Sequence, residues 1–130
     1  MARNYQHTKN NPHWLPHNVY MRVIYIVRDY DRMKQEQSAL IHSTPAQQGG
    51  SRSGLGNPTE NKAIILAQMS RETDAVDRAL AEIPEEYRRG VFRSAAYRDP
   101  YPITANESTW RRWKYRFTYA IAQNLRLIEP

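Results

Sequence analysis

The 130-residue sequence contains no cysteine. This absence excludes disulfide bonds, thiolate metal sites and cysteine nucleophiles, and it fits a protein of a reducing compartment. The chain also lacks any run of about 18 apolar residues, the length that a membrane span requires. No signal-peptide core follows Met1. We therefore expect a soluble, cytoplasmic protein that has no contact with a membrane.

Signals for strands, metal ions and catalysis are missing as well. No segment alternates apolar and polar residues with the period of two that predicts a β-strand. His7, His13 and His17 fit neither one helix face nor a zinc-finger spacing, and no cysteine or carboxylate lies near them to complete a shell. The acids around Pro84 flank a helix start, where the helix dipole favours them. We predict an all-α protein with no cofactor, no metal and no enzymatic activity.

Glycine is scarce, and its distribution divides the chain. Four of the five glycines lie between residues 47 and 57, and we expect a flexible loop over residues 43–57. This glycine-rich loop lacks the lysine and the spacing of a nucleotide-binding P-loop. Arg52, just before a helix start, leaves a simple anion cradle as an alternative to a plain linker.

Apolar residues at alternating steps of three and four predict a long helix on each side of this loop. The seam of the first, from about residue 18 to 42, is Val19, Val23, Ile26, Tyr30, Met33, Gln37 and Leu40. The second begins with Asn57 as cap and Pro58 in its first turn, and its seam is Leu66, Met69, Thr73, Val76, Leu80 and Ile83. We expect a long antiparallel hairpin over residues 18–83, preceded by a flexible arm at residues 1–17. The two seams can pack on each other within one chain or between two chains, so the sequence leaves open whether the protein forms a homo-oligomer.

Two further helices are predicted in residues 84–130. Pro84 opens the first, which runs from Glu85 to about Tyr97 and turns Tyr87, Val91 and Ala95 inward. Asn106 is the expected N-cap of the second. The apolar stripe of this closing helix is Trp110, Trp113, Phe117, Ile121, Leu125 and Ile128. The side chains expected away from it are Arg112, Tyr115, Arg116, Tyr119, Gln123 and Arg126.

Positive charge gathers in the same part of the chain. The net charge is +6, and residues 88–126 carry nine Lys or Arg against two acids together with most of the aromatic residues. This excess favours a polyanionic partner. The residues expected to contact duplex DNA are Ser108, Thr109, Arg111, Arg112, Tyr115 and Arg116, and those expected on backbone phosphates are Arg88, Arg89, Arg93 and Lys114. An ordinary surface helix with solvated arginines is the alternative interpretation.

Short motifs in these segments resemble known transcription proteins. Residues 83–88, Ile-Pro-Glu-Glu-Tyr-Arg, followed by a short helix and then residues 106–117, resemble the fourth region of bacterial sigma factors. The layout of residues 18–128 resembles the RinA-type phage transcriptional regulators. That resemblance includes the glycine-rich loop leading into Asn57-Pro58-Thr59 and the core Thr109-Trp110-Arg111-Arg112-Trp113.

The resemblance implies a helical, phage- or prophage-encoded regulator of late or packaging genes that acts on double-stranded DNA in the bacterial host cell. One departure concerns the helix that usually precedes the recognition helix. Only residues 98–107 are available for it, and two of them are prolines. That helix is absent, reduced to a turn near residues 103–106, or replaced by packing of Tyr97 and Tyr101. We thus expect a shortened helix-turn-helix.

The leading hypothesis is therefore a DNA-binding transcriptional regulator. The alternative is a non-enzymatic phage assembly or packaging adaptor that docks on a protein partner. The first hypothesis leaves undecided whether the protein also contacts RNA polymerase.

Overall fold

The computed structural model describes residue 6, residues 11–42 and residues 58–129. These ranges contain the helices α1 (His17–Arg28), α2 (Tyr30–His42), α3 (Pro58–Ala81), α4 (Glu85–Tyr97) and α5 (Glu107–Asn124). No strand occurs in them, which confirms the all-α prediction. The glycine-rich loop with Arg52, the cap Asn57 and the first histidine, His7, lie outside the described residues.

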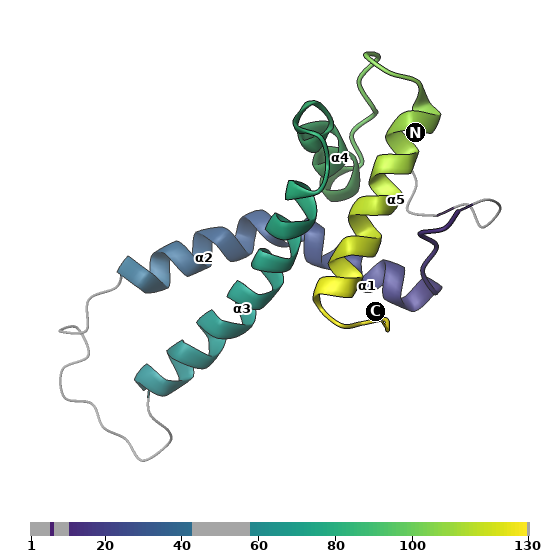
Figure 1. Ribbon diagram of the computed structural model, residues 1–130. Coiled ribbons are helices and arrows are strands. Elements are labelled where there is room, and N and C mark those ends of the chain that lie inside the picture. The colour runs from purple at the N-terminus through teal and green to yellow at the C-terminus, as the bar shows by residue number, and fades with distance from the viewer. Residues whose placement is uncertain (1–5, 7–10, 43–57, 130) are drawn as a thin grey trace.

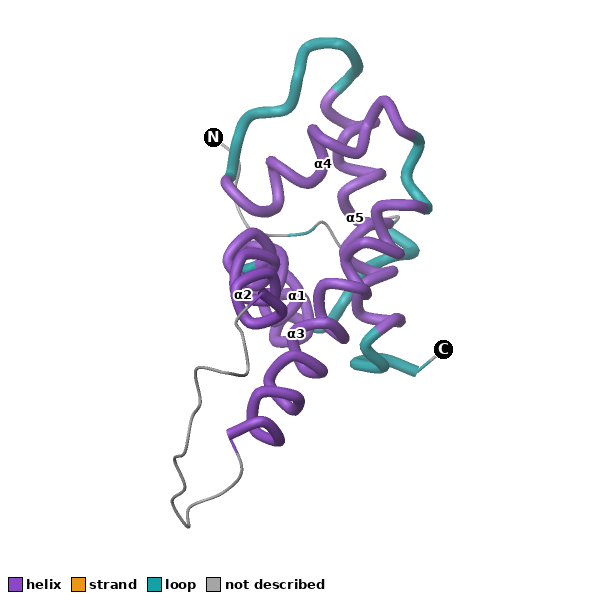
Figure 2. The backbone as a smooth tube through the Cα atoms, turned by 90° about the vertical axis from the view of Figure 1, so that its left-hand side faces the viewer, coloured by secondary structure: helices purple, strands orange, loops and turns teal. Residues whose placement is uncertain are grey.

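The helices form two parts, as Figure 1 shows. Helices α1, α4 and α5 pack on one another in a body, and α2 with much of α3 projects from it as an arm. Helix α3 joins the parts because it packs on α2 in the arm and on α5 in the body. Figure 2 shows the link between α4 and α5 as a loop that arches over one end of the body.

The sequence prediction of one helix over residues 18–42 is wrong, because the chain breaks at Asp29. Asp29 ends α1, and its amide donates to the carbonyls of Tyr25 and Ile26 at 3.0 and 3.1 Å. Its carboxylate accepts from the Arg32 guanidinium in α2 at 2.6 Å. No proline or glycine causes the break. The cause lies in the tertiary packing, because α1 packs on α4 and α5 whereas α2 packs along α3.

Polar contacts join α2 and α3 in antiparallel order. Gln37 Nε2 donates to Thr73 Oγ1 at 3.0 Å. One helical turn or more toward the body, the Tyr30 hydroxyl donates to the Asp77 carboxylate. Lys34 Nζ lies 3.2 Å from the same carboxylate. Gln37 and Thr73, which the sequence placed on the two seams, therefore contact each other.

Helix α4 has the predicted bounds and packs unusually close to α5. Gly90 explains this approach, because a Cβ at this position would lie 2.6 Å from Cζ3 of Trp110 and 3.2 Å from Cδ of Pro102. Trp110 is fully buried, so its ring has no room to move aside. Arg98, with φ at 60°, ends α4 in the left-handed conformation.

The link between α4 and α5 contains no helix. The Tyr101 ring stacks on Trp110 with centroids 5.9 Å apart and an interplanar angle of 8°. Tyr97 instead contacts Phe92 and donates to Asp31 of α2. Tyr101 therefore packs on the first turn of α5, in the position where a complete helix-turn-helix has a further helix.

The segment before α1 packs on the body. Leu15 is fully buried, and its amide donates to Gln6 Oε1 at 3.1 Å. His13 meets the Tyr119 ring edge to face, with centroids 5.2 Å apart. The described helices include none that is long and apolar enough to cross a membrane.

Candidate nucleic-acid interface

Helix α5 exposes only a narrow strip of its surface. Its core side follows the predicted apolar stripe as far as the helix extends, since Trp110, Phe117 and Ile121 are buried and Trp113 is half-buried. The helix ends at Asn124, earlier than the stripe predicted, so Leu125 and Ile128 lie beyond it. The exposed line, called here the outward stripe, consists of Ser108, Arg112, Arg116, Tyr119 and Gln123, of which Tyr119 is half-buried. Consecutive positions are three or four residues apart, so they follow one line along the helix. Glu107, the first residue of the helix, is also exposed and lies beside this line. The outward stripe is the surface of α5 that a large partner can reach.

The start of α5 differs in one detail from the expectation. Asn106 makes no side-chain cap hydrogen bond. Its backbone carbonyl accepts from the amides of Thr109 and Trp110 at 3.0 and 3.2 Å. Glu107 lies in the first turn, where a carboxylate interacts favourably with the helix dipole.

Several predicted contact residues lie on or next to the outward stripe at this end. Ser108 and Arg112 are exposed, and Thr109 is half-buried. Arg111 is paired with the Glu107 carboxylate, four residues earlier in α5. Arg112 has no ion pair within the described part of the chain, so its guanidinium faces solvent uncommitted.

Two predicted contact residues are buried, and the expectation that they face outward is wrong. Lys114 is 4% exposed and Tyr115 is 9% exposed. Burial, with a smaller contribution from the nearby Arg28, lowers the pKa of Lys114 to about 8. The physical reason is that α5 packs against α1, α3 and α4. The apolar stripe marks only part of the surface of α5 that these three helices cover.

The arginines of α4 are used in different ways. Arg88 Nε donates to the carbonyl of Ile83 at 2.8 Å, so this side chain satisfies backbone groups after α3. Arg93 forms an ion pair with Asp99 at 2.7 Å. Arg89 is exposed and has no ion pair among the described residues. Of the three phosphate contacts predicted on α4, only Arg89 has neither an ion pair nor a backbone hydrogen bond from its side chain among the described residues.

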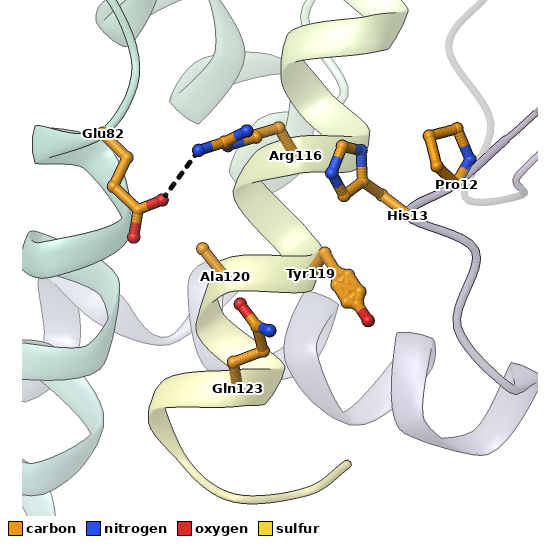
Figure 3. Close-up of a pocket in the computed structure, with 7 residues that line it drawn as sticks. All are labelled: Pro12, His13, Glu82, Arg116, Tyr119, Ala120 and Gln123. Carbon is orange, nitrogen blue, oxygen red and sulfur yellow. Dashed lines mark hydrogen bonds and ion pairs between the residues drawn. The ribbon is translucent and has the colours of Figure 1, made fainter. Parts of the chain in front are cut away.

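The middle of the outward stripe borders a polar cavity of about 270 Å³, called here the notch. Its lining includes His13, Glu82, Arg116, Tyr119, Ala120 and Gln123. Figure 3 shows Ala120 below Arg116, with Glu82 on one side of that arginine and His13 on the other. Arg116 Nη2 lies 3.4 Å from Glu82 Oε1. Burial, and secondly the charge of Arg116, lower the pKa of His13.

Sequence reasoning missed the notch. It treated His13 only as a metal ligand and Glu82 only as an acid near a helix start. The lining comes from three separate segments, the one before α1, the residue that follows α3, and α5. No local pattern brings such segments together. Only the residues of α5 could be recognised, because helical spacing predicted that Arg116, Tyr119 and Gln123 face away from the apolar stripe.

Searches of family models, curated proteins and solved structures found no match. In the described ranges, no three His, Asp or Glu side chains gather to hold a metal ion.

Proposed function

We propose that this protein is a phage-type transcriptional regulator that binds duplex DNA through the outward stripe of α5. The observation that carries the proposal is the position of Arg112. Its uncommitted guanidinium lies one turn beyond Ser108, near the N-terminal end of a helix whose other faces are packed. Recognition helices present short polar residues and arginines in this way, with the N-terminal residues nearest the bases.

Charge around this helix supports the same proposal. Arg89 on α4 is available for a backbone phosphate, and Arg111 can exchange its exposed pairing with Glu107 for a phosphate at little cost. The finer arrangement that we propose is a shortened helix-turn-helix formed by α4 and α5, with the arm setting its orientation. The resemblance to RinA-type regulators adds late or packaging genes as the target.

The test is the salt dependence of binding to a duplex of random sequence. We expect affinity to fall steeply with salt. Arg112→Ala should leave the fold intact, weaken binding by about 1–3 kcal/mol and reduce the salt slope by about one unit. The matched control is Arg22→Ala, which removes an exposed arginine of α1 beside a different cavity. Binding of Arg112→Ala as tight as that of the parent at low salt would contradict the proposal.

A second function is favoured by the arm. Ile41 of α2 and Ile64 and Ile65 of α3 are exposed there. Exposed apolar side chains on a projecting element are typical of a protein-docking surface. If DNA binding fails, the arm supports an assembly or packaging adaptor, and if it succeeds, the arm is available for a protein such as RNA polymerase.

A further inference from the structure

Glu82 poses a problem for a surface that binds a polyanion. Its carboxylate lies beside Arg116 in the middle of the outward stripe, where it repels phosphate. The side chains of Arg116 and Glu82 are 46% and 44% exposed. An ion pair this exposed contributes little to stability. Fold stability therefore gives a weak reason for an acid at this position.

The groups around the notch form a mixed set of donors and acceptors. Arg116 supplies N–H donors, Glu82 supplies acceptors, and the Gln123 amide, which Figure 3 shows turned up toward Ala120, supplies both. Ala120 is 4% exposed, and its small side chain leaves the space between them open. A ligand here must offer acceptors and a donor close together.

A phosphate does not meet this requirement, because all its exposed oxygens are acceptors and Glu82 would repel them. The major-groove edge of a G·C base pair does meet it. Guanine offers two acceptors, N7 and O6, which an arginine contacts with both arms of its fork, and cytosine offers the N4 amino donor, which a carboxylate accepts. Arg116 Nη2 and Glu82 Oε1 lie 3.4 Å apart, and guanine O6 and the cytosine N4 amino group are likewise neighbours on the edge of one base pair.

We propose that Arg116 and Glu82 together read one G·C base pair. Arg116 contacts the guanine, and Glu82 accepts from the cytosine amino group. Arg112, one turn earlier on the outward stripe, then lies near an adjacent base or phosphate. This inference rests on the proposed binding of duplex DNA, and it adds the base pair and the residues that select it.

The test is selection from a pool of randomised duplexes, with the full chain and with Glu82→Gln. The parent should enrich a G·C pair at one position. Glu82→Gln should reduce discrimination at that position on the order of tenfold, since a matched base contact is worth about 1–3 kcal/mol. Its affinity for random duplex should rise, because the substitution removes a negative charge. The rise in affinity follows from the charge alone, whereas a purely structural role of Glu82 predicts no loss of discrimination.

The matched control is Glu36→Gln, which also removes an exposed acid from an arginine pair but lies on α2. It should leave the selected sequence unchanged. A second variant, Arg116→Lys, keeps the charge and loses the fork. It should keep the salt dependence and weaken the preference for guanine, because lysine can still donate to O6 and N7 but without a fixed fork.

The possible failures are distinct. If the parent selects a sequence and Glu82→Gln selects the same one with equal discrimination, the base-reading inference is wrong and DNA binding stands. If the parent enriches no duplex and shows no salt-dependent binding, both the inference and the proposed function are wrong.

Discussion

Lys114 shows at the residue scale how packing changes the role of a side chain. A lysine beside two tryptophans in a basic helix suggests a phosphate contact, yet this one is 4% exposed and lies near Arg28. One guanidinium nitrogen of Arg28, Nη2, is itself buried without a hydrogen-bond partner. A protonated Lys114 therefore destabilises the folded state, because burial disfavours its charge.

This burial predicts a pH effect on stability. The pKa of Lys114 is about 8 in the folded state, whereas the ordinary pKa of a lysine is 10.5. Between these values the unfolded chain holds a proton that the folded chain has lost, so stability must rise with pH. We expect a gain of about 1 kcal/mol between pH 7 and pH 9. Denaturant titrations of the parent and of Lys114→Met should show the gain only in the parent.

Other titrating groups limit the pH range in which Lys114 dominates this effect. Burial raises the pKa of Tyr20 and of Tyr101, so these tyrosines lower the stability of the fold only as the pH passes about 10. The pKa of His13 is lowered and lies below the window. An equal gain in parent and Lys114→Met would assign the effect to another group.

At the scale of elements, the contact between α4 and α5 depends on one missing side chain. Gly90 lets the buried Trp110 ring lie against the α4 backbone. Tyr87 adds to the contact, edge to face with Trp110 and stacked on Trp113, with centroids 5.0 and 5.9 Å apart. The orientation of the outward stripe relative to Arg89 follows from this packing.

Gly90→Ala tests this contact because two effects oppose each other. Alanine favours a helix over glycine by about 1 kcal/mol. Its Cβ would overlap a tryptophan ring that cannot move, and overpacking costs about 1–3 kcal/mol. We expect net destabilisation by thermal or chemical denaturation, while Arg89→Ala on the exposed side stays close to neutral. A stabilised Gly90→Ala would mean that α4 and Trp110 lie farther apart.

At the scale of the whole molecule, burial is unevenly distributed. No residue in 34–42 of α2 or 59–68 of α3 is buried, whereas the body holds most of the core. The outer arm has little buried area to oppose local opening. The body and the part of α3 that packs on α5 keep the outward stripe in place.

Hydrogen exchange monitored by mass spectrometry should therefore separate the two parts. Amides of the outer arm should exchange far faster than those of α1 and α5, because opening free energies range from near zero to the global value. Slow exchange in the arm that becomes faster on dilution would show that another copy covers Ile41, Ile64 and Ile65. That result would support the homo-oligomer that the seam left open.

Much of the secondary structure followed from local chemistry. Proline and acidic residues at a helix start predicted the beginnings of α3 and α4, and spacing predicted the buried face of α5 around Phe117 and Ile121. These signals act within a few residues of the chain, so they can be recognised in the sequence. The clustering of basic and aromatic residues in the C-terminal third is likewise a property of composition.

Tertiary structure decided the rest, because it determines which faces of a helix are covered. Asp29 breaks a regular apolar pattern since its two halves pack on different partners. Lys114 and Tyr115 are buried because α5 has neighbours on several sides. The pairing of Arg116 with Glu82, 34 residues apart in the sequence, depends on how the end of α3 meets α5. Such contacts join residues that no local pattern connects, so only the folded chain brings them together.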